Sequence, residues 1–220
     1  MGEATREPTP PLPLITEVDR LILTERDEEF KPHEWDDMKK IVDANDLEVL
    51  RRWPSAQRKY MQWTAETEAE YGSLTNYILA HRLPKSWGSP PFTSASPVPF
   101  ENPADYRVLV NDWPYGFAPD MTHLVVWTRT RIKTEPVRGD LTPESRRIIQ
   151  DFVDRLFVAT VGENGEDRVI WFKNWVALQS VRTLEHIHVI VRNLDRDILR
   201  DWTEEKPWHR RRATGREMSK

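Results

Sequence analysis

The run LEHIHVIV, Leu184–Val191, constrains the fold of this chain more than any other segment. Its apolar residues are mostly β-branched, which is typical of a buried β-strand. Side chains two residues apart in a strand point to one face, so His186 and His188 share a face with Leu184. A histidine in this setting costs free energy unless its ring nitrogens find partners. The pattern predicts either two structural histidines bonded to backbone carbonyls or two histidines that converge on one ligand.

The second half of the chain alternates strand-like runs with one strong helix signal. Three more runs have a strand composition, namely residues 106–110, 123–127 and 168–172. Before the third run, Thr142 is a candidate N-cap, Pro143 suits the first helical position, and an apolar stripe follows to Phe157. This order predicts an α+β fold with an antiparallel sheet and one packed helix.

The first half of the chain carries helical periodicity. We expect three helices, the second with Ser55 as its N-cap and Gly72 as its stop, and the third starting near Ser73. Two apolar stripes support the first and second helices, namely Trp35, Met38, Ile41 and Val42, and then Tyr60, Trp63 and Thr67. We assign the aromatic residues of these stripes to packing on the sheet rather than to a ligand site.

These patterns divide the chain into five segments. We expect a flexible N-terminal arm (1–30), a helical extension (31–83), a linker rich in proline and serine (84–105), the sheet-containing core (106–203) and a basic C-terminal tail (204–220).

Composition excludes several classes of protein. The 220 residues carry a net charge of −4, so no duplex nucleic-acid partner is expected. There is no cysteine, which removes disulfides, thiolate metal sites and cysteine nucleophiles. No run of about 18 apolar residues and no secretory signal is present, so we expect a cytoplasmic protein with no membrane partner. No cofactor is expected, and a homodimer is compatible with the chain.

Two segments upstream of the histidine strand complete a recognisable order of motifs. VNDWPYGFAPDMTHLVVWTRTRI, Val110–Ile132, places a histidine after a proline-containing turn, and FKNWVALQSV, Phe172–Val181, ends a strand near Asn174. With the H-x-H strand, this order resembles the histidine-triad (HIT-like) superfamily of nucleotide hydrolases and transferases. The resemblance implies a HIT-like sheet and a histidine nucleophile that attacks phosphorus.

The same resemblance assigns roles to individual residues. An arginine follows the middle histidine of the family pattern by six residues, so Arg192 identifies His186 as the nucleophile and puts Leu184 in place of the first histidine. In this alignment His186 and His188 are catalytic. The residues implied to bind substrate are His123, Asn174, Gln179, Ser180, Asn111, Trp113 and Arg192.

At a finer level the chain resembles the fungal family of N-acetylglucosamine-induced proteins, which are uncharacterised. The resemblance spans about residues 33–202 and rests on segments such as HEWDDMKKIVDANDLEVLRR, YGSLTNYIL and WFKNWVALQSVRTLEHIHVIVR. It implies a cytoplasmic protein of the amino-sugar response. The ligand would then be a nucleotide, a nucleotide sugar such as UDP-N-acetylglucosamine, or another phosphorylated small molecule.

Two alternatives stay open at this point. Leu184 and the glycine-free loop WVALQ favour a non-catalytic binding or regulatory module on the same scaffold. A metal-dependent enzyme, with His123, His186 and His188 as ligands, is the third hypothesis, because three imidazoles suit zinc or iron.

Overall fold

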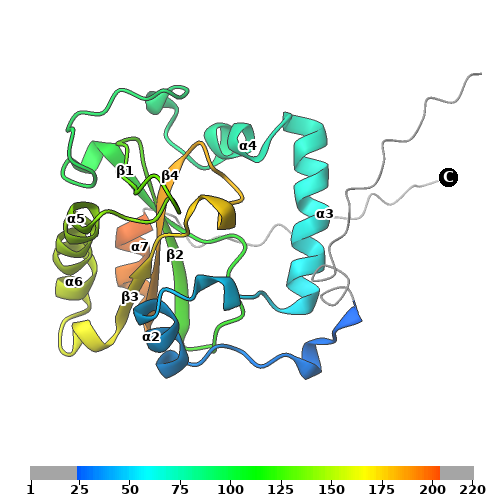
Figure 1. The fold of residues 1–220 in the computed structure, drawn as a ribbon. Coiled ribbons are helices and arrows are strands. Elements are labelled where there is room, and N and C mark those ends of the chain that lie inside the picture. Colours follow the sequence, from blue (N-terminus) through cyan, green and yellow to red (C-terminus); the bar gives the residue numbers. More distant parts are fainter. Residues whose placement is uncertain (1–23, 204–220) are drawn as a thin grey trace, which may run out of the picture.

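The computed structural model describes residues 24–203, which form an α+β fold around one four-stranded antiparallel sheet (Figure 1). Most of the expected arm and all of the expected tail lie outside these residues. Among the described residues, none of the helices is long and apolar enough to cross a membrane. The elements in chain order are α2 (Trp35–Asp43), α3 (Pro54–Tyr71), α4 (Leu74–His81), β1 (Tyr106–Val110), β2 (Met121–Thr128), α5 (Pro143–Val153), α6 (Ala159–Val161), β3 (Val169–Phe172), β4 (Glu185–Arg192) and α7 (Arg196–Thr203).

The sheet has the strand order β1-β2-β4-β3, and every neighbouring pair is antiparallel. The histidine strand β4 is therefore central, flanked by β2 and β3. His186 lies opposite Trp127 of β2, and His188 lies between Val125 of β2 and Phe172 of β3. All four strands begin and end within two residues of the predicted runs, which confirms the α+β class and the antiparallel sheet.

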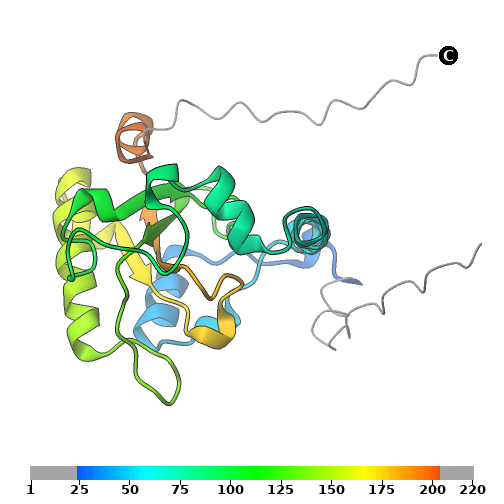
Figure 2. The same ribbon diagram turned by 90° about the horizontal axis from the view of Figure 1, so that it is seen from above.

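One face of the sheet is sealed by α5 and the segment after it. Thr142 caps α5 by accepting a hydrogen bond from the Ser145 N–H at 3.2 Å, and Pro143 occupies the first helical position, both as predicted. The helix continues through a π-helical turn, Asp154–Val158, into α6. Phe152 and Phe157, each at most 1% exposed, pack with α7 and the inward residues of the strands into one apolar core. Figure 2 shows α5 and α6 together on this side.

The opposite face, which carries the histidines, is covered by two separate groups of N-terminal residues. Around α2, Trp35 and Met38 pack with residues of β3 such as Phe172. Around α4, Leu74 and Ile78 pack with residues of β1 and β2. Helix α3 stands to one side of the sheet in both views (Figures 1 and 2). Different helices, α2 and α4, therefore cover the two ends of this face.

The helix boundaries confirm two predictions and correct one. Gly72 ends α3 in the left-handed conformation with φ of 78°, and the Ser73 side chain caps α4 by accepting from the Asn76 N–H. Ser55, however, does not cap α3. The helix begins one residue earlier because Pro54 already has the backbone angle of a first helical residue, and Ser55 instead donates to Asp27 at 2.5 Å.

The segment 84–105 contacts both sides of the sheet. Trp87 is buried with the residues around α4, and Phe100 is buried in the core beneath α5. Asp105 fastens the segment, because its carboxylate accepts hydrogen bonds from the backbone N–H groups of Ala95 and Ser96 and pairs with Arg129 at 2.5 Å.

Candidate functional site

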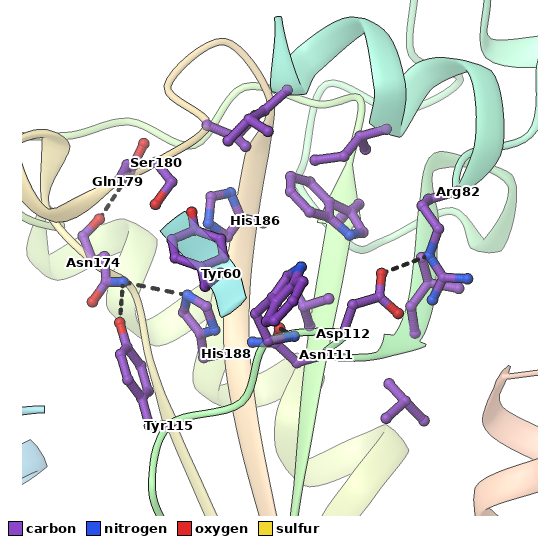
Figure 3. Close-up of a pocket in the computed structure, with 18 of the residues that line it drawn as sticks. Tyr60, Arg82, Asn111, Asp112, Tyr115, Asn174, Gln179, Ser180, His186 and His188 are labelled. Atoms are coloured by element: carbon purple, nitrogen blue, oxygen red, sulfur yellow. Dashed lines mark hydrogen bonds and ion pairs between the residues drawn. The ribbon is translucent and has the colours of Figure 1, made fainter. Parts of the chain in front are cut away.

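A cavity of about 150 Å³ lies over the histidine face of the sheet, between the two groups of N-terminal residues (Figure 3). Its floor combines the polar side chains of His186, His188 and Asn174 with apolar residues of β1 and β2 such as Val125. Its walls come from α3, α4 and the loop between β1 and β2. We call it the histidine cavity. Seven of the predicted site residues line it, namely Asn111, Trp113, Asn174, Gln179, Ser180, His186 and His188.

His186 is held in one tautomer by the backbone. Its Nδ1 lies 2.9 Å from the carbonyl oxygen of Leu184, and a carbonyl can only accept, so Nδ1 carries the proton. Burial lowers the pKa of His186 to about 4, so the ring is neutral at pH 7. Its Nε2 has no hydrogen-bond partner among residues 24–203, and the ring lines the histidine cavity. The side chain therefore presents an unprotonated nitrogen in a cavity.

The tautomer of His188 follows from a chain of hydrogen bonds. The Oδ1 of Asn111 accepts from the Trp113 N–H at 2.9 Å, so its Nδ2 is the group that donates to Nε2 of His123 at 3.2 Å. That Nε2 also lies 3.0 Å from Nδ1 of His188, which must then be the donor. The longer contact of the Tyr115 N–H with the other nitrogen of His123, 3.4 Å, is the weaker constraint. The Nε2 of His188 is therefore also unprotonated.

Burial keeps this histidine pair neutral. It lowers the pKa of His123 to about 3, and the positive charge of Arg52 acts in the same direction. Burial is also the main reason that the pKa of His188 lies well below its usual value, with the nearby His123 adding to the effect. His123 does not line the cavity but lies behind His188 and orients it.

The segment after β3 supplies amide groups beside the histidines. Nδ2 of Asn174 lies 3.4 Å from Nε2 of His188 and donates to the hydroxyl of Tyr115 at 3.1 Å. Gln179 folds back and donates to the carbonyl oxygen of Asn174 at 2.6 Å, which fixes this loop (Figure 3). Oδ1 of Asn174 is buried with no partner among the described residues. Ser180 is exposed and marks the mouth of the cavity.

Arg192 lies outside the histidine cavity, in contrast to the seven residues that line it. It ends β4 and pairs with Asp120 at 2.7 Å. Alternation along the strand does put Arg192 on the same face as His188. Four residues of strand still separate them by about 13 Å, however, and Asp120 holds the guanidinium at that distance.

The aromatic wall of the cavity includes Tyr60 and Trp63, which the sequence assigns to packing alone. Trp63 does pack against the apolar group around α4, as predicted, and lines the cavity as well. Tyr60 and Trp63 are both half-buried, and their rings lie 5.4 and 5.3 Å from that of Trp113. Their spacing of three residues on one helix face was visible in the sequence. Arg52, which also lines the cavity, had no signal in the sequence.

The geometry does not support the three-histidine metal site. Within residues 24–203, no group of three or more histidine, cysteine or acidic side chains is placed to hold a metal ion. The Nε2 of His123 is occupied by His188 and Asn111, so His123 cannot serve as a third ligand.

The comparisons with known proteins place the chain in a family. A family model described as a protein of unknown function (DUF3605) matches residues 34–192. The chain belongs to this family. The match spans the N-terminal helices as well as the sheet, so the DUF3605 unit includes both the floor and the walls of the histidine cavity.

Two curated relatives of this DUF3605 chain come from fungi. N-acetylglucosamine-induced protein 1 of Candida albicans is 28% identical over 184 residues, which cover 74% of this chain and 70% of the relative. Uncharacterized protein YPL067C of Saccharomyces cerevisiae is 26% identical over 171 residues, covering 77% of this chain and 84% of the relative. The first relative supports the resemblance to the N-acetylglucosamine-induced proteins.

One solved structure has a similar fold. The crystal structure of HTC1 superimposes with a TM-score of 0.59 at 22% sequence identity, covering 78% of this chain and 93% of that chain. At this identity the likeness concerns the fold alone.

Proposed function

We propose that the histidine cavity binds a nucleotide or nucleotide sugar and that His186 acts on its phosphorus atom. The observation that carries this proposal is the neutral His186, whose proton is fixed on Nδ1 by the Leu184 carbonyl and whose Nε2 is free. A neutral imidazole nitrogen is a nucleophile, and a covalent histidine intermediate divides one difficult displacement into two easier steps. With UDP-N-acetylglucosamine, Nε2 would bond to the α-phosphorus as the bridging P–O bond breaks and N-acetylglucosamine 1-phosphate leaves, and water would then cleave the P–N bond to release UMP.

The other groups of the floor suit the stabilisation of phosphoryl oxygens. Gln179 keeps a second N–H on its Nε2 beside the one given to Asn174, and the Ser180 hydroxyl stands at the mouth. Nδ2 of Asn174, in contrast, already contacts Tyr115 and His188 and would have to leave one of them to donate to a phosphate. Hydrogen-bond donors that are already in position stabilise the charge that develops on phosphoryl oxygens in the transition state. These residues would hold the phosphate while His186 attacks.

The size of the cavity limits what it can enclose. A volume of about 150 Å³ is close to that of a cavity that holds one benzene ring. The aromatic wall of Tyr60, Trp63 and Trp113 suits one base or sugar ring. A nucleotide sugar would therefore place one ring inside and extend past Ser180 into solvent.

A binding or regulatory module without catalysis is the second candidate. Leu184 is 2% exposed and packs in the apolar group around α4. The position that the histidine-triad pattern gives to its first histidine is therefore occupied by a buried apolar side chain. The Candida relative is named for induction by N-acetylglucosamine, which is compatible with either function in an amino-sugar response.

A thermal-shift measurement, followed by a product assay, tests the proposal. Uridine monophosphate (UMP) and UDP-N-acetylglucosamine should raise the melting temperature, because a ligand that binds only the folded state stabilises it. Release of UMP from UDP-N-acetylglucosamine that is lost in His186→Ala supports the enzyme. A thermal shift without product supports the binding module, and no shift with either compound at millimolar concentration contradicts both.

A further inference from the structure

Arg52 brings a positive charge to the histidine cavity that no carboxylate of the described residues neutralises. It precedes α3, is half-buried and lines the cavity. None of the carboxylates among residues 24–203 pairs with it, whereas Arg82, the other arginine of the lining, pairs with Asp112 at 3.1 Å. A half-buried positive charge with no negative partner costs free energy. An anionic ligand would offset that cost.

The guanidinium of Arg52 is held rigidly. Its Nε donates to the carbonyl oxygen of Trp113 at 3.1 Å, and Nη1 donates to Gln57 at 3.3 Å. Its Cζ lies 4.2 Å from the ring centre of Tyr60 and 5.2 Å from that of Tyr115. Both N–H groups of Nη2 and one of Nη1 have no partner among the described residues. A fixed, planar cation with spare donors is the arrangement that recognises phosphate and carboxylate.

The position of Arg52 connects it with the floor of the cavity. Tyr115, which it faces, accepts the hydrogen bond of Asn174, and Trp113 belongs to the loop that orients His123 through Asn111. Its charge is close enough to lower the pKa of both His123 and His188. The cation therefore lies on the same side of the sheet as the histidines.

We propose that Arg52 is the anion-binding residue of the histidine cavity and that the ligand is recognised by its phosphate group rather than as a neutral sugar or nucleoside. This inference rests on the proposed function and names the charge of its ligand. It gives the N-terminal helices a role in recognition, because Arg52 and the ring of Tyr60 come from that part of the chain.

Titration calorimetry with UMP and uridine tests this role. The two compounds differ only in the phosphate, so their affinity ratio measures what the phosphate contributes. In Arg52→Gln, we expect UMP to bind about 10- to 100-fold more weakly, which is the range of one charge-assisted hydrogen bond, with uridine affinity unchanged. Arg52→Lys keeps the positive charge but loses the planar guanidinium. Its UMP affinity should lie between those of the wild-type protein and Arg52→Gln.

The control is Arg51→Gln, which removes the same charge one residue away. Arg51 is exposed, pairs with Glu25 and lies outside the cavity, so it should leave both affinities unchanged. If the wild-type protein binds UMP and Arg52→Gln keeps the same ratio of UMP affinity to uridine affinity, the role of Arg52 is refuted while the proposed function stands. If both variants of Arg52 lose uridine as well, its role is to shape the loop and the proposal is overturned. Wild-type protein that binds neither compound refutes both proposals.

Discussion

The two faces of the sheet are built in different ways. The face beneath α5 is covered by α5, α6 and α7 together with Phe100, and it forms one apolar core in which residues such as Phe152 and Ile187 show 0–1% exposed surface. The other face is covered by two groups of N-terminal residues, and the histidine cavity lies between them. A face whose covering elements share one apolar core leaves no space, whereas a face covered by two separate apolar groups leaves room for polar side chains and a ligand.

Replacing one large aromatic side chain by alanine on each face should show the largest difference in unfolding free energy between the two faces. Phe152→Ala on the sealed face should cost about 3–5 kcal/mol of unfolding free energy, because it removes a fully buried ring. Tyr60→Ala at the cavity wall should cost less than half of that, because Tyr60 is half-buried beside open space, but it should weaken UMP binding. Urea denaturation measures both costs, and equal costs would remove the distinction between the faces.

The histidine face should also be the acid-sensitive one. Its three buried histidines have lowered pKa values, about 4 for His186 and about 3 for His123. The unfolded chain protonates its histidines near pH 6.5, so stability is complete above that pH and falls as the pH decreases toward the folded-state values. Each histidine should contribute ~1.4 kcal/mol per pH unit in this window.

Urea denaturation between about pH 6.5 and pH 5 measures that slope, with a measurement near pH 7.5 as the reference for full stability. The variant His123→Asn removes one of the three titrating groups, so its slope should be smaller by ~1.4 kcal/mol per pH unit. A slope identical to that of the wild-type protein would mean that His123 is not held neutral in the folded state.

The smallest effect is expected at Arg192. Its ion pair with Asp120 joins two half-exposed side chains, and such pairs contribute less than about 1 kcal/mol. Because Arg192 lies outside the histidine cavity, Arg192→Ala should leave UMP affinity unchanged. A clear loss of affinity would restore the role that the histidine-triad pattern implies for this residue.

The sequence predicted the sheet and the floor of the cavity because both depend on local periodicity. Alternation along β4 was enough to put His186 and His188 on one face. The end of β3 brought Asn174 near them. The HIT-like relationship, and with it the catalytic role of His186, stays a prediction.

The walls of the cavity could not be predicted in the same way. Arg52 precedes α3 and Tyr60 lies in it, more than a hundred residues before β4, and a stripe of aromatic residues has the same pattern whether it faces a core or a cavity. Arg192 was predicted to belong to the site but lies outside the cavity. It shares a strand face with His188, but a shared face does not bring two side chains together when they are far apart along the strand. Tertiary contacts decide both cases.

The nitrogen-15 spectrum of the histidine side chains tests the central claim most directly, because it reports the tautomer of each ring and its contact with a ligand. At pH 7 we expect His186 to be neutral with its proton on Nδ1, and the resonance of its free Nε2 to move when UMP is added. A proton on Nε2 of His186, or resonances of His186 and His188 that do not change with UMP or UDP-N-acetylglucosamine, would contradict the account.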